Sequence, residues 1–211
     1  MPEPETQFDK CYSECAALLR RTGSADETFG AAMAIIDDDY RNNTLARLAL
    51  LLVDSGQVGQ ALRFCSAISR SLDRALAFAD LGRALLKRGA SVDARDALSR
   101  AEEASREIEQ PDDASLAYLQ ICESLARAGQ GDHALTLLRR AAQLAQSSPQ
   151  HFEAAKTLRG CARLLASWNR VAEAITLAKT ISDQWSELRE TSLREIQANG
   201  ASDADRDAGR E

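Results

Sequence analysis

The chain has few of the residues that build β-structure or interrupt helices. Of its 211 residues only 5% are aromatic, four are proline and eleven are glycine. Ala, Leu, Arg and Glu, which are good helix formers, fill most windows, whereas the β-branched and aromatic runs typical of strands are missing. We therefore expect an all-α protein. A chain of this length with 45% hydrophobic residues can bury one sizeable core, so one domain is expected.

Long apolar runs and an excess of basic residues are also missing. No stretch of about 18 or more apolar residues occurs, and the N-terminus MPEPETQFD is acidic, so neither a membrane-spanning helix nor a secretory signal is predicted. The formal net charge is −6, of which residues 1–9 contribute −3 and residues 197–211 contribute −2. The nearly neutral body lacks the basic stripe that binds phosphates. We expect a cytoplasmic protein that binds neither nucleic acid nor membranes.

The sequence shows no pattern of a catalytic or metal site. There are five cysteines but no CxxC, and His133 and His151 are not spaced as zinc ligands. Four cysteines fall on apolar or small positions of the repeat described below, where a free thiol packs as a small hydrophobe: Cys15, Cys65, Cys122 and Cys161. The GxSxG motif and phosphate-binding glycine loops are missing too. We expect no enzyme activity, no cofactor and no metal.

A turn residue recurs between the helical segments. It is glycine in four places and asparagine in one: Gly23, Gly56, Gly89, Gly129 and Asn169. The intervals are 33, 33, 40 and 40 residues. Glycine and asparagine most readily take the left-handed backbone conformation just past a helix end. The series therefore predicts five helical hairpins, each turning at one of these residues.

Apolar and small residues keep fixed distances from these turns. Four residues before each turn stands a leucine: Leu19, Leu52, Leu85, Leu125 and Leu165. Seven before it stands a small residue: Ala16, Ala49, Gly82, Cys122 and Ala162. Five after it stand Thr28, Ala61, Ala94, Ala134 and Ala174, and twelve after it Ile35, Ile68, Ala101, Ala141 and Ile181. Such spacings place apolar residues on one stripe of each helix, and the small residues predict that the two helices of a hairpin cross closely.

The 40-residue intervals hold seven extra residues, which is close to two turns of an α-helix. We therefore expect longer second helices in the third and fourth hairpins, with the same face turned inward. Pro111 is expected to bound the first of these helices, and Ser148 with Pro149 to start the helix that follows the second.

Residues 118–138 bring these features together at the spacing of a known repeat. The matching positions are Tyr118, Ile121, Cys122, Leu125, Ala134 and Leu138. They resemble the tetratricopeptide repeat (TPR), and the other four repeats match likewise, over about residues 12–190. The closing proline of the family and its period of about 34 residues are missing. The resemblance implies a right-handed α-solenoid of about five antiparallel helical hairpins that acts as a non-enzymatic protein-protein interaction scaffold or adaptor.

The pattern divides the chain into three parts. Residues 1–8 are expected to form a flexible acidic N-terminus, residues 9–197 the repeat domain, and residues 198–211 a disordered acidic tail. The repeats are expected near 9–41, 42–74, 75–114, 115–154 and 155–182. Residues 183–197 are expected to form a capping helix, which such arrays need for solubility.

The resemblance also implies a concave groove lined by the first helix of each hairpin. The side chains expected to line it are Arg83, Lys87, Arg127, Arg159, Arg163, Leu50, Leu119 and Glu123. Its later part is cationic, so it could receive an acidic segment or a C-terminal carboxylate from a protein or peptide partner. The alternative is a solvated face in which Glu123 balances part of the charge. The carboxylate-binding pattern of some family members needs an asparagine that is missing here.

Two other functions stay open at this stage. The first is a dedicated chaperone for a secreted or assembling protein, which would dimerise through the N-terminal hairpin, where Phe8, Tyr12 and Phe29 are expected to be partly uncovered. The second is a self-associating structural protein, which would need apolar terminal faces; the polar last helix, with Glu187 and Arg189, argues against it. A monomer or weak homodimer is expected.

Overall fold

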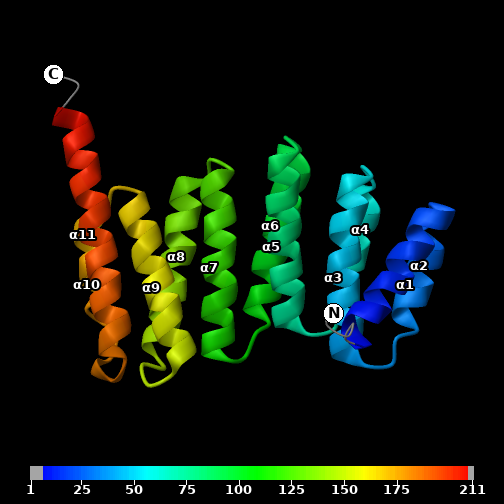
Figure 1. Ribbon diagram of the computed structural model, residues 1–211, viewed down its shortest axis with the longest axis horizontal. Helices are drawn as coiled ribbons and strands as arrows, with labels where there is room; N and C mark the ends of the chain where they lie inside the picture. The colour runs from blue at the N-terminus through cyan, green and yellow to red at the C-terminus, as the bar shows by residue number, and fades with distance from the viewer. Residues whose placement is uncertain (1–6, 209–211) are drawn as a thin grey trace, which may run out of the picture. The chain divides into compact units, whose positions relative to one another are not determined.

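The protein consists of α-helices joined by short turns. In a computed structural model, the backbone is described for residues 7–208 and the side chains for residues 9–198, and within this range no strand occurs. Figure 1 shows the helices as antiparallel pairs. The predicted all-α class of helical hairpins is confirmed. The chain forms two compact units, residues 1–107 and 108–211, rather than the one core that length suggests, because each hairpin of a repeat protein contacts only its neighbours.

Unit 1 contains three hairpins. The first helices of these hairpins are α1 (Gln7–Thr22), α3 (Asp38–Asp54) and α5 (Ser71–Lys87), and the second helices are α2 (Ala25–Met33), α4 (Val58–Ser66) and α6 (Ser91–Arg106). Each first helix packs against its own second helix. In addition, α1 packs on α3, and α3 packs on α5, so the first helices form one layer of the unit.

Unit 2 contains two hairpins and a final helix. The hairpins are α7 (Pro111–Arg127) with α8 (Gly131–Gln146), and α9 (Phe152–Ser167) with α10 (Val171–Ala178). A 3-10 turn, Asp183–Trp185, leads into α11 (Ser186–Ala208). The helices α7, α9 and α11 pack in this order. The predicted capping helix therefore takes the place that the first helix of a further hairpin would occupy.

Several boundaries differ from those expected from the sequence. The helix α3 begins at Asp38 and α7 begins at Pro111, each earlier than the predicted repeat boundary. The helix α9 begins at Phe152 rather than near Pro149, because residues 148–151 form a turn in which the His151 N–H donates to the Ser148 carbonyl at 3.0 Å. The helix α11 continues past residue 197 to Ala208. Residues 1–6 and 209–211 of the predicted flexible ends lie outside the described residues.

The five predicted turn residues all take the left-handed conformation. The φ angles are 66° at Gly23, 77° at Gly56, 78° at Gly89, 76° at Gly129 and 59° at Asn169. Asn169 is the only non-glycine residue with positive φ in the described part of the chain. In the last four turns the N–H of the residue after the turn donates to the carbonyl of the leucine that precedes the turn by four residues, at 2.8 to 3.0 Å. This bond satisfies a carbonyl that the helix end would otherwise leave free.

Small residues allow the helices to approach closely, as the sequence predicts. The small residues five after each turn are fully buried. Gly82 of α5 faces Leu98 of α6, and a Cβ added at Gly82 would lie 2.8 Å from the Leu98 side chain and 3.3 Å from the Ala94 carbonyl oxygen. The tight crossing of this hairpin therefore depends on the absence of a side chain at Gly82.

The second helices fall into two length classes. The helices α2, α4 and α10 have nine, nine and eight residues, whereas α6 and α8 have sixteen each. The longer helices belong to the two 40-residue repeats, which confirms the expected lengthening. Seven added residues keep the buried face inward, since Ala101 and Ala141 are fully buried and lie within α6 and α8.

Each short second helix is followed by an arginine that binds its C-terminal end. Arg41 Nη1 donates to the Ile35 carbonyl at 2.9 Å, Arg74 Nη1 to the Ile68 carbonyl at 2.9 Å, and Arg189 Nη1 to the Ile181 carbonyl at 3.3 Å. The guanidinium groups thus satisfy carbonyls that no further helical turn can reach. We call these three contacts the arginine clamps; each joins one hairpin to the first helix that follows.

The cysteines occupy the packing positions expected of them. Cys15, Cys65, Cys122 and Cys161 are buried and Cys11 is half-buried, and all five are free thiols. Burial raises the pKa of Cys65 to about 12 and that of Cys161 to about 12. These thiols are therefore neutral at physiological pH and serve as packing groups.

Replacing Gly82 by alanine is expected to lower the free energy of unfolding by about 1–3 kcal/mol, because the new methyl group overpacks the α5–α6 crossing. Gly59→Ala is the matched control, since nothing lies within 4 Å of the added Cβ in α4; it should be neutral or stabilising by up to about 1 kcal/mol. Urea denaturation followed by circular dichroism measures both. Equal effects of the two substitutions would show that the crossing is not tightly packed.

Removing the middle arginine clamp is expected to destabilise unit 1. Arg74→Ala leaves the Ile68 carbonyl without its charged donor, which costs about 1.5–3 kcal/mol. Arg106→Ala removes only an exposed pair with Glu102 of the same helix and should cost less than about 0.5 kcal/mol. The same denaturation experiment compares the two, and a loss for Arg74→Ala no larger than that of the control would contradict the clamp.

Candidate partner-binding surface

The residues predicted to bind a partner lie on the first helices. In unit 1 these are Leu50 on α3 and Arg83 and Lys87 on α5. In unit 2 they are Leu119, Glu123 and Arg127 on α7 and Arg159 and Arg163 on α9. Because the first helices of each unit pack side by side, the structure gives each unit a layer on which its predicted residues lie. We call these two layers the inner surfaces of units 1 and 2.

Arg83 is held by a neighbour on its own helix. Its guanidinium forms an ion pair with Asp80, and 34% of the Arg83 side chain is exposed. Burial raises the pKa of Asp80, while the charge and hydrogen bond of Arg83 oppose the rise. The positive charge of Arg83 is therefore largely neutralised by Asp80 of the same helix.

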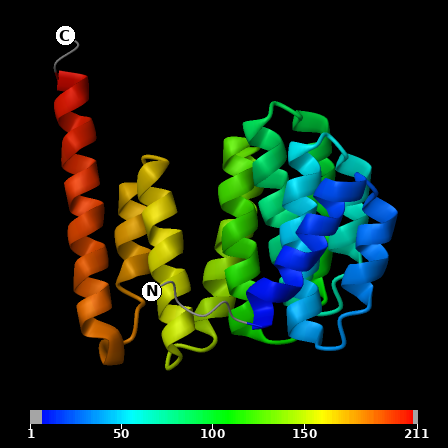
Figure 2. The same ribbon diagram turned by 45° about the vertical axis from the view of Figure 1, so that its right-hand side comes forward.

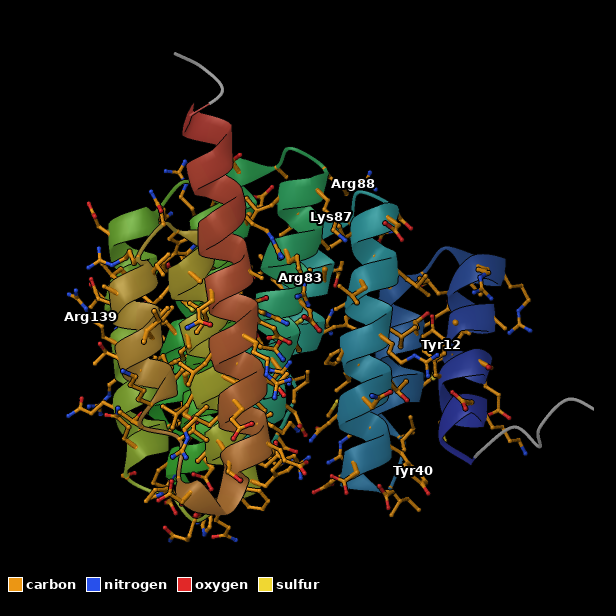
Figure 3. The ribbon with its side chains drawn as sticks, turned by 60° about the vertical axis from the view of Figure 1, so that its left-hand side comes forward. Tyr12, Tyr40, Arg83, Lys87, Arg88 and Arg139 are labelled. Atoms are coloured by element: carbon orange, nitrogen blue, oxygen red, sulfur yellow. The ribbon has the colours of Figure 1, made fainter. Side chains whose placement is uncertain are left out.

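Lys87 lies further along the same helix and is exposed. Figure 3 shows Arg83, Lys87 and Arg88 following one another toward the C-terminal end of α5. Arg88 lies 3.5 Å from the Asp54 carboxylate of α3. A lysine at this end of α5 also interacts favourably with the helix dipole. Of the two cations predicted in unit 1, Lys87 is the one that is exposed to solvent.

In unit 2 the predicted cations divide into two kinds. The Arg159 guanidinium lies 2.5 Å from the Glu195 carboxylate of α11, and 32% of its side chain is exposed. Arg127 and Arg163 are exposed, and neither forms an ion pair or hydrogen bond with any described side chain. Two of the three arginines on this inner surface therefore have charges that no described residue neutralises.

The three remaining predicted residues differ in exposure. Leu50 and Glu123 are partly exposed. Leu119 is buried, which corrects its expected place on an open groove. Its Cδ2 atom would lie 2.6 Å from a Cβ added at Gly160 of α9, so Leu119 fills the space that a glycine leaves between α7 and α9.

An acidic cleft of about 320 Å³, which was not expected from the sequence, lies between α3 and α5. Its charged lining residues are Asp39, Arg70, Asp73 and Asp80. Arg70 binds Asp73 through two hydrogen bonds of 2.9 and 3.0 Å and lies 3.5 Å from Asp39. This part of the inner surface of unit 1 is therefore polar. The spacing of Asp73 and Asp80, two helical turns apart, is the signal that could have revealed it.

The described side chains offer no metal site, because no group of three or more His, Cys, Asp or Glu residues is placed to hold an ion. Among the described helices, none combines the length and apolar character that crossing a membrane requires.

No family model matches the sequence, and no curated protein matches it significantly. Among solved structures, Ton1535 from Thermococcus onnurineus NA1 is similar over 91% of this chain, with a TM-score of 0.54 and 17% identity. The chain spans 57% of the length of that protein. The nearly identical TPR-like repeats of a Podosopora anserina protein match over 95% of this chain and 98% of theirs, with 15% identity and a TM-score of 0.45. At 17% identity the similarity to Ton1535 concerns the fold alone. The match to the Podosopora anserina repeats, with a TM-score of 0.45, carries no further conclusion.

The Asp80–Arg83 pair allows a direct test of the electrostatics of unit 1. NMR titration of the side-chain carboxyl groups should give Asp80 a pKa above that of an ordinary aspartate, because burial disfavours the carboxylate. Arg83→Gln should raise this pKa further, since it removes the neighbouring positive charge. Lys87→Gln is the control and should change the pKa less. A pKa of Asp80 that falls or stays constant in Arg83→Gln would contradict the pairing.

Proposed function

We propose that this TPR-like helical-repeat protein is a non-enzymatic scaffold that binds a protein or peptide partner on the inner surfaces of its first helices. Helical-repeat folds of this kind generally serve protein interaction, because stacked hairpins offer extended surfaces rather than a single deep cavity. The function proposed for this chain rests on its own inner-surface residues.

The observation that carries the proposal is the pair of arginines on the inner surface of unit 2. Arg127 and Arg163 are exposed and have no partner among the described side chains. Glu123 lies one helical turn before Arg127 and is partly exposed, but it pairs with neither in the described part of the chain. Arginine binds carboxylates through two parallel hydrogen bonds. We therefore propose that the partner presents an acidic segment or a C-terminal carboxylate to this surface.

The chaperone alternative is less well supported by the N-terminal hairpin. The Arg47 guanidinium lies 3.7 Å from the ring centroid of Tyr12, between α1 and α3 (Figure 3). Phe29 packs on Phe64 with ring centroids 5.1 Å apart, and the Arg63 guanidinium lies 4.2 Å from the ring centroid of Phe29. Both aromatic rings thus have partners within unit 1, and the Phe8 side chain lies outside the described residues. A monomer or weak homodimer stays our prediction.

We place the protein in the cytoplasm and expect it to bind neither nucleic acid nor membranes. Five free cysteines in one chain support a reducing compartment. The opposing charges on the inner surfaces, with Arg127 and Arg163 in unit 2 and the acidic cleft in unit 1, support a protein partner over a polyanion, which needs a continuous basic stripe.

The test is affinity capture from the native lysate with the wild type and with Arg127→Glu/Arg163→Glu. We expect loss of specific partners by at least about tenfold, because each reversed charge replaces attraction by repulsion. The control Arg95→Glu/Arg140→Glu makes the same charge change on the exposed faces of the second helices α6 and α8 and should keep all partners. Circular dichroism verifies that both variants are folded.

A captured protein is then titrated directly against the purified chain at two salt concentrations. Binding that weakens with salt for the wild type and is lost only in the inner-surface variant supports the proposal. An identical partner list for wild type and inner-surface variant would refute this use of unit 2, and capture of the chain by itself alone would favour self-association.

A further inference from the structure

An aromatic pocket lies at the end of unit 2 where α9 and α11 begin. Both helices start at the same end of the unit, as Figures 1 and 2 show. The pocket has a volume of about 590 Å³ and is lined by the following residues: Phe152, Gln184, Trp185, Ser186, Glu187, Leu188 and Thr191. None of these residues is among those proposed above to bind a partner on the inner surfaces, so this pocket is independent of the proposed function.

Two of the chain's few aromatic residues form one wall of this pocket. The ring centroids of Phe152 and Trp185 lie 4.9 Å apart and the rings are tilted by 52°. Phe152 is the first residue of α9 and is 47% exposed, which is unusual for a large apolar side chain in a sequence with so few aromatics. Two tilted ring faces that border the same pocket offer the surface on which a cation binds best.

A cation already lies near one of the rings. Lys156 Nζ is 5.5 Å from the ring centroid of Phe152. Its charge is balanced by Glu153, whose carboxylate oxygens lie 2.9 and 3.0 Å from Nζ. Lys156 therefore neither fills the pocket nor leaves an unbalanced positive charge beside it.

Glu187 is the only charged residue that lines the pocket. The other charged groups near the start of α11 are paired: Asp183 with Arg189 at 2.5 Å and Glu190 with Arg194 at 3.3 Å. Glu187 is exposed and has no ion-pair partner in the described part of the chain. The pocket therefore combines an aromatic wall with one uncompensated negative charge, and this charge complementarity defines its ligand as a single cation.

We propose that this pocket binds an arginine or lysine side chain of a partner protein, stacked on Phe152 and Trp185 and paired with Glu187. A guanidinium or ammonium group gains a cation–π contact and an ion pair at once. The pocket volume also leaves room for the alkyl part of the side chain, which packs against Leu188. A carboxylate in the first turn of α11 stabilises the helix dipole as well, so stability alone cannot test the proposal and the readout has to be binding.

The experiment follows the indole N–H signals of ¹⁵N-labelled protein by NMR. The signals of the two tryptophans are assigned with Trp168→Phe, in which Trp185 gives the only indole N–H signal. The probe is the blocked peptide acetyl-Gly-Arg-Gly-amide, added in the millimolar range because one exposed cation–π contact and one ion pair give weak binding. We expect a saturable shift of the Trp185 signal and none of Trp168. The same peptide with citrulline, which is isosteric but neutral, should cause less than about half of that shift.

Two variants locate the interaction within the pocket. Glu187→Gln and Phe152→Leu should each weaken binding about two- to fivefold, the factor that one such contact supplies. Phe152→Leu keeps an apolar cover over Trp185, and Glu190→Gln is the control, which should bind like the wild type. Equal shifts with both peptides, the absence of a Trp185 shift, or unchanged affinity in both pocket variants would each overturn the proposal.

Discussion

The hydrogen bond that closes the last four turns is the constraint on which their hairpins depend. The residue at the turn must take a positive φ, because only then does the next N–H point back at the carbonyl five residues earlier. That carbonyl belongs to a leucine whose side chain is buried in the same hairpin. One residue therefore ends the first helix through its backbone and anchors it through its side chain. The direction of the second helix, and hence its crossing at the small residues, follows from this geometry.

The second helices end in two different ways, and these correspond to the two repeat lengths. Two or three residues after each short second helix lies an isoleucine whose carbonyl accepts a hydrogen bond from an arginine of the helix that follows. A long second helix continues through the same position, which is occupied by a fully buried alanine. Ala101 and Ala141 stand where Ile68 and Ile181 stand in the shorter repeats. The arginine clamps and the long second helices therefore occur in different hairpins.

Much of the fold could be predicted from the sequence because it depends on local rules. Turn residues, leucines and small residues recur at fixed spacings, and even Asn169 could be recognised as the fifth turn by its place in the series. The exposure of the site residues could not be predicted in the same way. Whether Arg159 is free depends on Glu195, which is distant in sequence, and the burial of Leu119 depends on a glycine in another helix. Spacing says which face a residue lies on, but its neighbours decide what remains accessible.

The difference of seven residues between long and short second helices has a consequence for how such a protein changes. Seven residues return the chain to nearly the same angle around the helix axis, so the buried face continues in register along the lengthened helix. A hairpin can therefore gain or lose two turns of outer helix while its inner surface stays as it was. The first and second helices of a hairpin can therefore change in length independently. The second helix can gain two turns while the first helix, which carries the inner surface, stays the same.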